Sequence, residues 1–345
     1  MKLRPRMAFY CLAMTAVAAA EPSSSPAALV RPIALPGAPT TGVVMDYIAY
    51  DRGHHRVWVP AGNTGSVDVI DTRTGAVTRI EGFPTTEIER NGTKRQVGPS
   101  SATVGDGVVY VGNRADNTVC AVSADTLKKG ACVTLDAMPD GIAYVPSTRE
   151  VWVTLPRVNA LAVVDASKPA ALTVKTKIDL PGQPEGFAVD DGRGLFYTNL
   201  EDKDRTLTLD VKTRKVTRTW MPECGKDGPR GLAVDAKRNL LIVACTDRVR
   251  VLDAGHDGRQ LSTLEVGEGI DDVNYVDSRQ ELFAAAGRAG KITIARLGPD
   301  GALAPVASVA TAPGARNAVA TEDGVAYLTD ARGGKILVVE RPAAR

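Results

Sequence analysis

The chain has 345 residues, enough for one large core, and its 44% hydrophobic and 24% charged residues are typical of a soluble globular protein. This balance argues against disorder over most of the chain, and no run reaches the roughly 20 apolar residues of a membrane span. The formal net charge is +2, with Lys2, Arg4 and Arg6 among the basic residues. The rest of the chain is therefore near −1, which leaves no basic excess for binding nucleic acid.

Residues 1–20 have the layout of a secretory signal peptide. A basic start is followed by an apolar run from Ala8 to Ala20, which ends in small residues before Glu21. The run is short for an uncleaved anchor, and Cys11 lies inside it rather than after it, which disfavours a lipoprotein signal. We expect a mature chain that starts near Glu21, a flexible lead-in over residues 21–29, no membrane span after cleavage, and a periplasmic or secreted location.

One pattern then recurs seven times through residues 30–345. In each copy a short strand such as Gly141–Val145 precedes a polar turn and a strand of the "VWV" type, as at Val151–Val153. A turn rich in Asn, Gly and Asp leads to a strand such as Leu161–Asp165, and a fourth strand follows. Four short strands in every 40–45 residues or so are the signature of a propeller blade. The sequence therefore predicts one all-β domain, a seven-bladed β-propeller of four-stranded blades.

Two irregularities interrupt this repeat. The first copy is lengthened by a polar insertion around residues 85–97, which we expect to be a surface loop. The seventh copy stops after its third strand, near Glu340. A strand from about Val30 to Ala34 is the expected donor of the missing fourth strand. Such closure removes the exposed sheet edges that promote aggregation.

Charged residues recur at the start of the first strand of each blade. In a propeller these starts surround one mouth of the central channel, here called the funnel mouth. We predict a ligand-binding site there from the aligned charged residues Asp46, Asp140, Glu185, Arg230, Asp271 and Arg316; Ser100 takes the position in blade 2. The alternative is that these charges are solvated or paired across the ring.

Two ligand classes fit this ring. A cation such as Ca²⁺ or Mg²⁺ prefers oxygen ligands and would bind beside Asp46, Asp140 and Glu185, because Asp140 has no arginine next to it in the ring. An anionic or sugar-acid ligand would instead bridge Arg230 and Arg316. If the charges instead pair across the ring, Arg230 would pair with Glu185 or Asp271, and Arg316 with Asp271 or Asp46.

Several motifs resemble known propeller families. The segments Tyr197-Thr-Asn199 and Val109-Tyr-Val-Gly-Asn113 resemble the YVTN repeat, which implies the fold but no particular activity. The turns at Pro139-Asp-Gly, Pro184-Glu-Gly and Pro229-Arg-Gly are more loosely similar to those of the regucalcin and gluconolactonase propellers. That resemblance implies a metal-assisted lactone hydrolase with ligands or a base drawn from Asp46, Asp140, Glu185 and Asp271. The two arginines in the same ring depart from the pattern.

Four cysteines lie outside the predicted signal peptide, and export permits two disulfides. We expect a Cys224–Cys245 bridge, with Cys120–Cys132 as a second pair; the alternative is four buried free thiols. His54, His55 and His256 lie in turns of distant blades, so we expect no three-histidine metal site and a solvent-exposed His54–His55 pair.

Two functional hypotheses follow. The first is a binding or scaffold protein of the cell envelope that holds a partner protein or a small polar ligand at the funnel mouth. The second is a metal-dependent hydrolase of the lactonase type. Neither hypothesis involves nucleic acid, and the sequence leaves open whether the protein is an enzyme.

Overall fold

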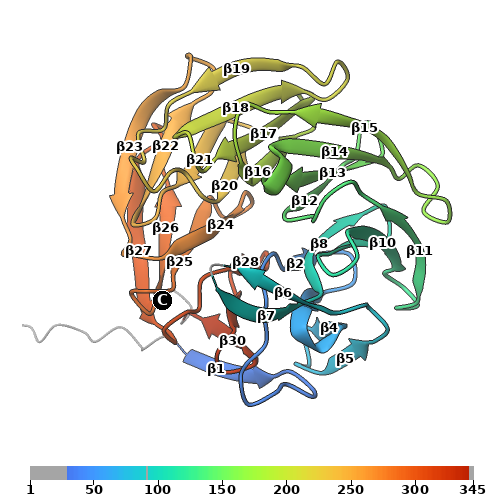
Figure 1. The fold of residues 1–345 in the computed structure, drawn as a ribbon. Coiled ribbons are helices and arrows are strands. Elements are labelled where there is room, and N and C mark those ends of the chain that lie inside the picture. Colours follow the sequence, from blue (N-terminus) through green and yellow to red (C-terminus); the bar gives the residue numbers. More distant parts are fainter. Residues whose placement is uncertain (1–28, 91, 342–345) are drawn as a thin grey trace, which may run out of the picture.

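The computed structural model describes residues 29–90 and 92–341, in which seven four-stranded antiparallel sheets form a ring (Figure 1). This confirms the predicted seven-bladed propeller. The proposed signal peptide and nearly all of the lead-in lie outside the described residues.

Each blade runs outward from the channel, with its first strand innermost (Figure 1). Blades 1 to 3 consist of β2 (Ala49–Asp51), β3 (Arg56–Ala61), β4 (Ser66–Asp71) and β5 (Val77–Ile80); β8 (Pro99–Gly105), β9 (Val108–Asn113), β10 (Thr118–Ser123) and β11 (Lys129–Thr134); and β12 (Ile142–Val145), β13 (Glu150–Leu155), β14 (Ala160–Asp165) and β15 (Thr173–Asp179). Short 3₁₀ turns, η1 (Gly62–Thr64) and η2 (Pro156–Val158), follow β3 and β13.

The remaining blades have the same order. Blades 4 to 6 consist of β16 (Pro184–Asp190), β17 (Leu195–Leu200), β18 (Arg205–Asp210) and β19 (Val216–Trp220); β20 (Leu232–Asp235), β21 (Leu240–Ala244), β22 (Arg248–Asp253) and β23 (Arg259–Glu265); and β24 (Ile270–Val276), β25 (Glu281–Ala286), β26 (Lys291–Leu297) and β27 (Leu303–Ala310). Blade 7 combines β28 (Ala318–Ala320), β29 (Ala326–Asp330) and β30 (Lys335–Glu340) with β1 (Leu29–Ala34).

Local chemistry explains the blade pattern. β-Branched and aromatic residues fill the second and third strands, and those that lie between neighbouring sheets are fully buried. Trp152 of blade 3, for example, packs on Phe196 of blade 4 with 4.8 Å between ring centroids. In the turns, aspartates cap the backbone: Asp190 Oδ1 accepts the Arg193 N–H at 3.1 Å, and its other oxygen accepts from the Arg193 guanidinium at 2.7 Å.

The N-terminal strand closes the ring. β1 pairs with β30 over six positions, from Leu29 opposite Glu340 to Ala34 opposite Lys335. Ile33 and the following Leu35 are buried against blade 7 and blade 1. The predicted closure by a strand from the other end of the chain is therefore confirmed.

The insertion between blades 1 and 2 differs from the expected loop. It forms a separate two-stranded hairpin, β6 (Thr86–Arg90) paired with β7 (Thr93–Val97). The alternation of residues in Thr-Glu-Ile-Glu and Lys-Arg-Gln-Val suits a pair of strands with polar faces. The prediction of a loop rested on the polarity of the segment alone and missed this hairpin. The hairpin packs beside η1 and crosses the ring near the channel (Figure 1).

Two disulfides are present in the structure. Cys120 and Cys132 face each other on β10 and β11. Cys224, in the loop before β20, is joined to Cys245, the residue after β21. Each bridge belongs to a single blade, Cys120–Cys132 to blade 2 and Cys224–Cys245 to blade 5. Both pairs are the ones predicted from the sequence.

Removal of β1 tests the closure. A variant that begins at residue 36 lacks β1, Ile33 and Leu35, and should lose about 3–6 kcal/mol of unfolding free energy from these two side chains alone. Chemical denaturation measures the loss, and a variant that begins at Leu29 is the matched control. Equal stability of the two variants would show that ring closure does not depend on β1.

Candidate functional site

The funnel mouth contains a cavity of about 630 Å³. All six charged residues of the predicted ring line it, from the starts of the first strands of blades 1, 3, 4, 5, 6 and 7. Ser100 of blade 2 is buried and is not among the lining residues. The repeat thus brings together side chains that are up to 270 positions apart in the sequence.

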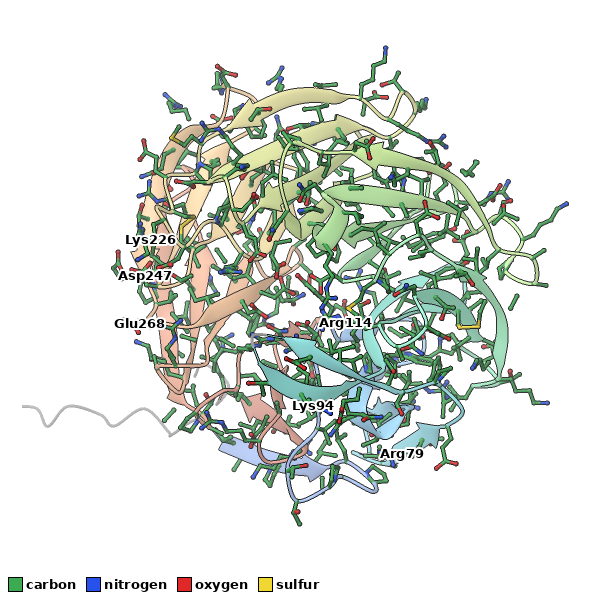
Figure 2. All side chains as sticks on the ribbon, viewed as in Figure 1. Arg79, Lys94, Arg114, Lys226, Asp247 and Glu268 are labelled. Carbon is green, nitrogen blue, oxygen red and sulfur yellow. A yellow bond between two sulfur atoms is a disulfide. The ribbon has the colours of Figure 1, made fainter. Side chains whose placement is uncertain are left out.

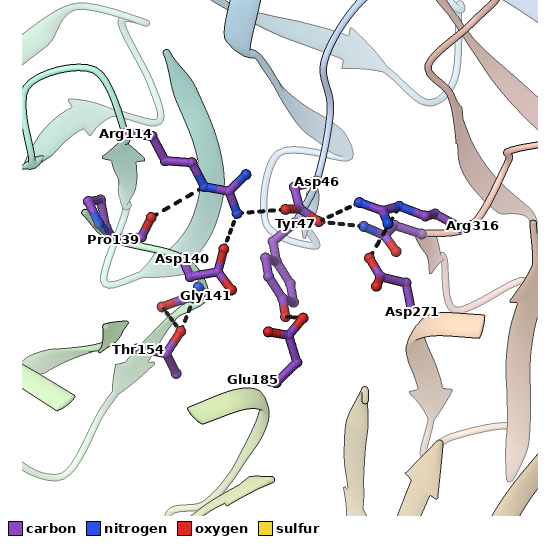
Figure 3. Close-up of polar contacts among 11 residues, drawn as sticks. Asp46, Tyr47, Arg114, Pro139, Asp140, Gly141, Thr154, Glu185, Asp271 and Arg316 are labelled. Carbon is purple, nitrogen blue, oxygen red and sulfur yellow. Dashed lines mark hydrogen bonds and ion pairs between the residues drawn. The ribbon is translucent and has the colours of Figure 1, made fainter. Parts of the chain in front are cut away.

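Arg114 is a central residue of this site that the sequence prediction missed. Its Nη2 lies 2.7 Å from Asp46 Oδ2, and the same nitrogen contacts Asp140 Oδ1 (Figure 3). The side chain is 16% exposed and points toward the middle of the ring (Figure 2). Asp140 therefore does have an arginine partner, contrary to our expectation. The reason is that the turn after the second strand of a blade, here β9, reaches the same face as the start of the first strand.

Asp46 contacts three side chains, two through hydrogen bonds and one through an ion pair. Besides Arg114, Arg316 Nη2 lies 3.7 Å and Asn317 Nδ2 2.9 Å from Asp46 Oδ1. Arg316 Nε also lies 3.3 Å from Asp271 Oδ2, so Arg316 contacts the two acids expected for it (Figure 3). These contacts join blade 1 to blades 2, 6 and 7 at the mouth.

Arg230 has a different partner from the one expected. It forms an ion pair with Glu201, the residue after β17, rather than with Glu185 or Asp271. Glu201, like Arg114, belongs to the turn between the second and third strands of its blade. Aligning the ends of the second strands, in addition to the starts of the first, would have found both residues.

Glu185 has no basic partner within the described part of the chain. Its Oε1 accepts a hydrogen bond of 3.4 Å from the Tyr47 hydroxyl (Figure 3). Burial and the nearby charges of Asp140 and Asp271 raise the pKa of Glu185 well above its usual value. Burial likewise raises the pKa of Asp140, although Arg114 opposes the shift.

Further carboxyl groups of the channel are shifted in the same direction. Burial raises the pKa of Asp271 to about 6, with Arg316 opposing the shift. Its neighbour Asp272, which lines a separate channel cavity with Tyr47, has its pKa raised by burial to about 7. The channel therefore retains protons at a pH where ordinary carboxyl groups are ionised.

The β6–β7 hairpin forms one wall of the mouth. Ile88, Glu89 and Arg95 line the cavity from the hairpin, together with Pro156 and Arg157 of blade 3. The insertion therefore contributes directly to the site. It gives the cavity apolar and charged groups that lie outside the seven-fold repeat.

The arrangement offers little for a metal ion. Within residues 29–90 and 92–341, no group of three or more His, Cys, Asp or Glu side chains is placed to hold one. The arginine fork of Arg114 occupies the space between Asp46 and Asp140, two of the three expected ligands.

The histidines are engaged elsewhere. His54 is not solvated as expected: its side chain is 28% exposed, and its two ring nitrogens lie 2.7 Å from carboxylate oxygens of Asp51 and Asp125. These hydrogen bonds, that of Asp125 first, raise the pKa of His54. His256 Nδ1 lies 2.8 Å from Asp253.

Comparisons with known proteins support the fold. No protein-family model and no curated protein matches the sequence. Among solved structures, a chain of the mitotic checkpoint complex is 12% identical with a TM-score of 0.75, covering 98% of this chain and 99% of that one. Virginiamycin B lyase from Staphylococcus aureus is 13% identical with a TM-score of 0.69, covering 91% and 100%. A streptogramin B lyase is 12% identical with a TM-score of 0.70, covering 91% and 98%. At these identities the likeness shows the β-propeller fold alone.

No helix in the described residues has the length and apolar character needed to cross a membrane.

The raised carboxyl pKa values predict how stability depends on pH. Below about pH 4 both the folded and the unfolded chain hold these protons; above it the unfolded chain loses them first. The stability that the bound protons give to the folded chain is therefore lost as the pH rises through the pKa of each folded group, about 6 for Asp271 and about 7 for Asp272. We expect the melting temperature to fall between pH 5 and pH 8.

Asp272→Asn, which mimics the protonated acid, should flatten this fall, and the exposed Asp277→Asn is the control. His54 contributes a change of the same sign to both variants, so it does not affect their difference. A melting temperature that rises across this range, or an Asp272→Asn profile that runs parallel to the wild type, would contradict the assignment.

Proposed function

We propose that this chain is an exported β-propeller that binds, at its funnel mouth, a small polar organic molecule carrying a cationic group. The observation that carries the proposal is Glu185, a partly buried carboxyl group that lines a large cavity and has no basic side chain paired to it among the described residues. Such a group either keeps a proton or receives a positive charge from a ligand.

The charges of the lining point to Glu185 as the place for that positive group. Six carboxyl groups and five guanidinium groups line the cavity. The three arginines of its floor already contact other acids: Arg114 contacts Asp46 and Asp140, Arg316 contacts Asp46 and Asp271, and Arg230 contacts Glu201. A ligand ammonium or guanidinium beside Glu185 would supply the charge that the protein does not.

An organic cation suits the site better than a metal ion. Ca²⁺ takes six to eight oxygen ligands, and Mg²⁺ takes a near-octahedral set. Two of the carboxylates that would serve, Asp46 and Asp140, are already bridged by Arg114. The metal-dependent lactonase alternative, which relies on Asp46, Asp140 and Glu185, has correspondingly less support.

The neighbouring structures do not decide between a binding protein and an enzyme. They include a component of a checkpoint assembly and two lyases, and one fold serves many activities. We propose binding as the function because it requires only the side chains that line the cavity. The Tyr197-Thr-Asn199 and Val109–Asn113 segments support membership of the YVTN-repeat propellers.

Export is supported by two features. The first 20 residues have the signal-peptide layout, and two disulfides join all four cysteines of the described chain. Disulfides persist in oxidising compartments such as the periplasm or the extracellular space. We therefore propose that the mature protein is periplasmic or secreted.

Cell fractionation and thiol labelling test export together. The full chain with a C-terminal tag, made in a bacterial host, should be recovered from the exported fraction with its first residue near Glu21. Labelling of the denatured, unreduced protein should find no free thiol. The Cys224→Ser/Cys245→Ser variant should lose about 3 kcal/mol of unfolding free energy, because the bridge closes a loop of 21 residues. Four free thiols, or retention of residues 1–20, would contradict export.

Calorimetry at pH 7 tests ligand binding. The probes are argininamide, putrescine, CaCl₂, MgCl₂ and gluconate. At least one organic cation should bind and release a proton from Glu185, so that the measured heat varies with the ionisation enthalpy of the buffer. Glu185→Gln should weaken binding at least tenfold and abolish proton release, whereas the exposed Glu81→Gln should change neither.

Two results would count against the proposal. Binding of Ca²⁺ or Mg²⁺ that is lost in Glu185→Gln, without binding of an organic cation, would favour the metal alternative. Binding of none of the probes would make the proposed function wrong.

A further inference from the structure

A second cavity adjoins the funnel mouth, and we infer that it is an anion subsite of the same binding site, so that the ligand carries a positive group at one end and a negative group at the other. This inference rests on the proposed function and specifies its ligand class. The cavity measures about 430 Å³, and the charged residues that line it are Arg230, Arg288, Arg316, Arg332 and Asp271.

The two cavities are contiguous. Arg230, Asp271 and Arg316 line both of them. At Glu185 the first cavity offers a carboxyl group with no basic partner among the described residues, whereas four of the five charged residues that line the second cavity are arginines. A ligand that spans the two cavities therefore meets opposite charges at its two ends.

Two of the four guanidinium groups are available to a ligand. Arg332 is exposed and forms no ion pair or hydrogen bond among the described residues. Arg288 Nη1 lies 3.6 Å from Glu268 Oε2, but the side chains are 74% and 71% exposed, and exposed pairs of this kind contribute little. Both arginines can therefore turn to an anion at small cost.

The repeat explains why these arginines converge. Arg288 is the second residue after β25, and Arg332 is the second residue after β29. These are equivalent positions in the adjacent blades 6 and 7, on the face that also carries Arg114 and Glu201. The same turn position in blade 3 carries Arg157, on the wall of the first cavity.

The wall between the arginines leaves room for a ligand. Gly269, Gly287 and Gly314 line the cavity and present no side chain to it. At Gly269, where φ is +87°, a Cβ atom would lie 2.5 Å from the Arg288 backbone nitrogen. A larger residue there would displace the Arg288 turn.

The ligand class follows from this chemistry. Guanidinium groups bind carboxylate or phosphate oxygens through paired N–H donors. The opposite end requires an ammonium or guanidinium group for Glu185. A short peptide with free termini satisfies both requirements with a carboxylate, and an aminoalkyl phosphate satisfies them with a phosphate.

Retention on the immobilised full-length mature protein, quantified by mass spectrometry, tests the inference. The probes are a random tripeptide mixture with free termini, the same mixture N-acetylated, the same mixture C-amidated, and 6-aminohexyl phosphate. Free-termini peptides or the aminoalkyl phosphate should be retained. Acetylation and amidation should each lower peptide retention at least tenfold, and preference for the phosphate probe would identify phosphate as the anion.

Variants assign each end of the ligand. Arg288→Met/Arg332→Met should lower retention about tenfold and remove the difference between free and amidated peptides, while sensitivity to acetylation remains. Glu185→Gln should remove the sensitivity to acetylation. The exposed pair Arg52→Met/Arg73→Met is the control and should match the wild type, and melting temperatures check that each variant is folded.

The outcomes separate this inference from the proposed function. If acetylation abolishes retention but amidation and the double arginine variant have no effect, the anion subsite is wrong and the proposed function stands. If the amidated peptides and the phosphate probe are retained equally in wild type and Glu185→Gln, the cation site is wrong. If no probe is retained, both proposals fail.

Discussion

The carboxylate of Asp46 holds the funnel mouth together. It lies at the entry to blade 1, accepts hydrogen bonds from Arg114 of blade 2 and Asn317 of blade 7, and forms an ion pair with Arg316 of blade 7. Through Arg114 it is coupled to Asp140 of blade 3, and through Arg316 to Asp271 of blade 6. A buried carboxylate without partners is strongly unfavourable. The attraction between Asp46 and its partners therefore fixes the positions of Arg114 and Arg316 around it.

This arrangement determines what the site can bind. Asp46 pairs with Arg114 and Arg316, and Glu201 pairs with Arg230, so among the described residues Glu185 has no guanidinium partner. Burial and the neighbouring carboxylates raise the pKa of this carboxyl group, and we propose that a cationic ligand supplies the positive charge that it lacks. The same engagement of Arg114 works against a metal ion at Asp46 and Asp140. On the far side of Arg316, the second cavity is lined by four arginines and one acid, Asp271, so a ligand that reaches both cavities would meet Glu185 at one end and arginines at the other.

The architecture could be predicted from the sequence because each blade repeats one pattern. Strands of the Val-Trp-Val type, turns rich in Asn and Gly, and the incomplete seventh copy determine the blades and the donor strand β1. Alignment of the first strands also found six residues that line the mouth. The pattern is strong because every blade must bury the same faces against its neighbours.

The predictions that were wrong concern features outside this repeat. Arg114 and Glu201 belong to turns after second strands, which the alignment of the first strands did not include. Because Arg114 pairs with Asp140 and Glu201 pairs with Arg230, the ion pairs of these two ring residues differ from those predicted. The β6–β7 hairpin was expected to be a loop because its strands bury little, so hydrophobicity does not identify them. His54 was expected in solvent, but its ring bonds Asp51 of its own turn and Asp125, a residue 71 positions away that the repeat does not identify as a neighbour.

The central claim is that Glu185 is a neutral acid in the free protein and becomes ionised when a cationic ligand binds. A ¹³C NMR titration of the side-chain carboxyl groups, with the Glu185 signal assigned by its absence in Glu185→Gln, measures this directly. We expect the free protein to show a Glu185 pKa well above the usual 4.5, and we expect saturating argininamide to lower it. Titration of Glu185 near 4.5 in the free protein would contradict the account.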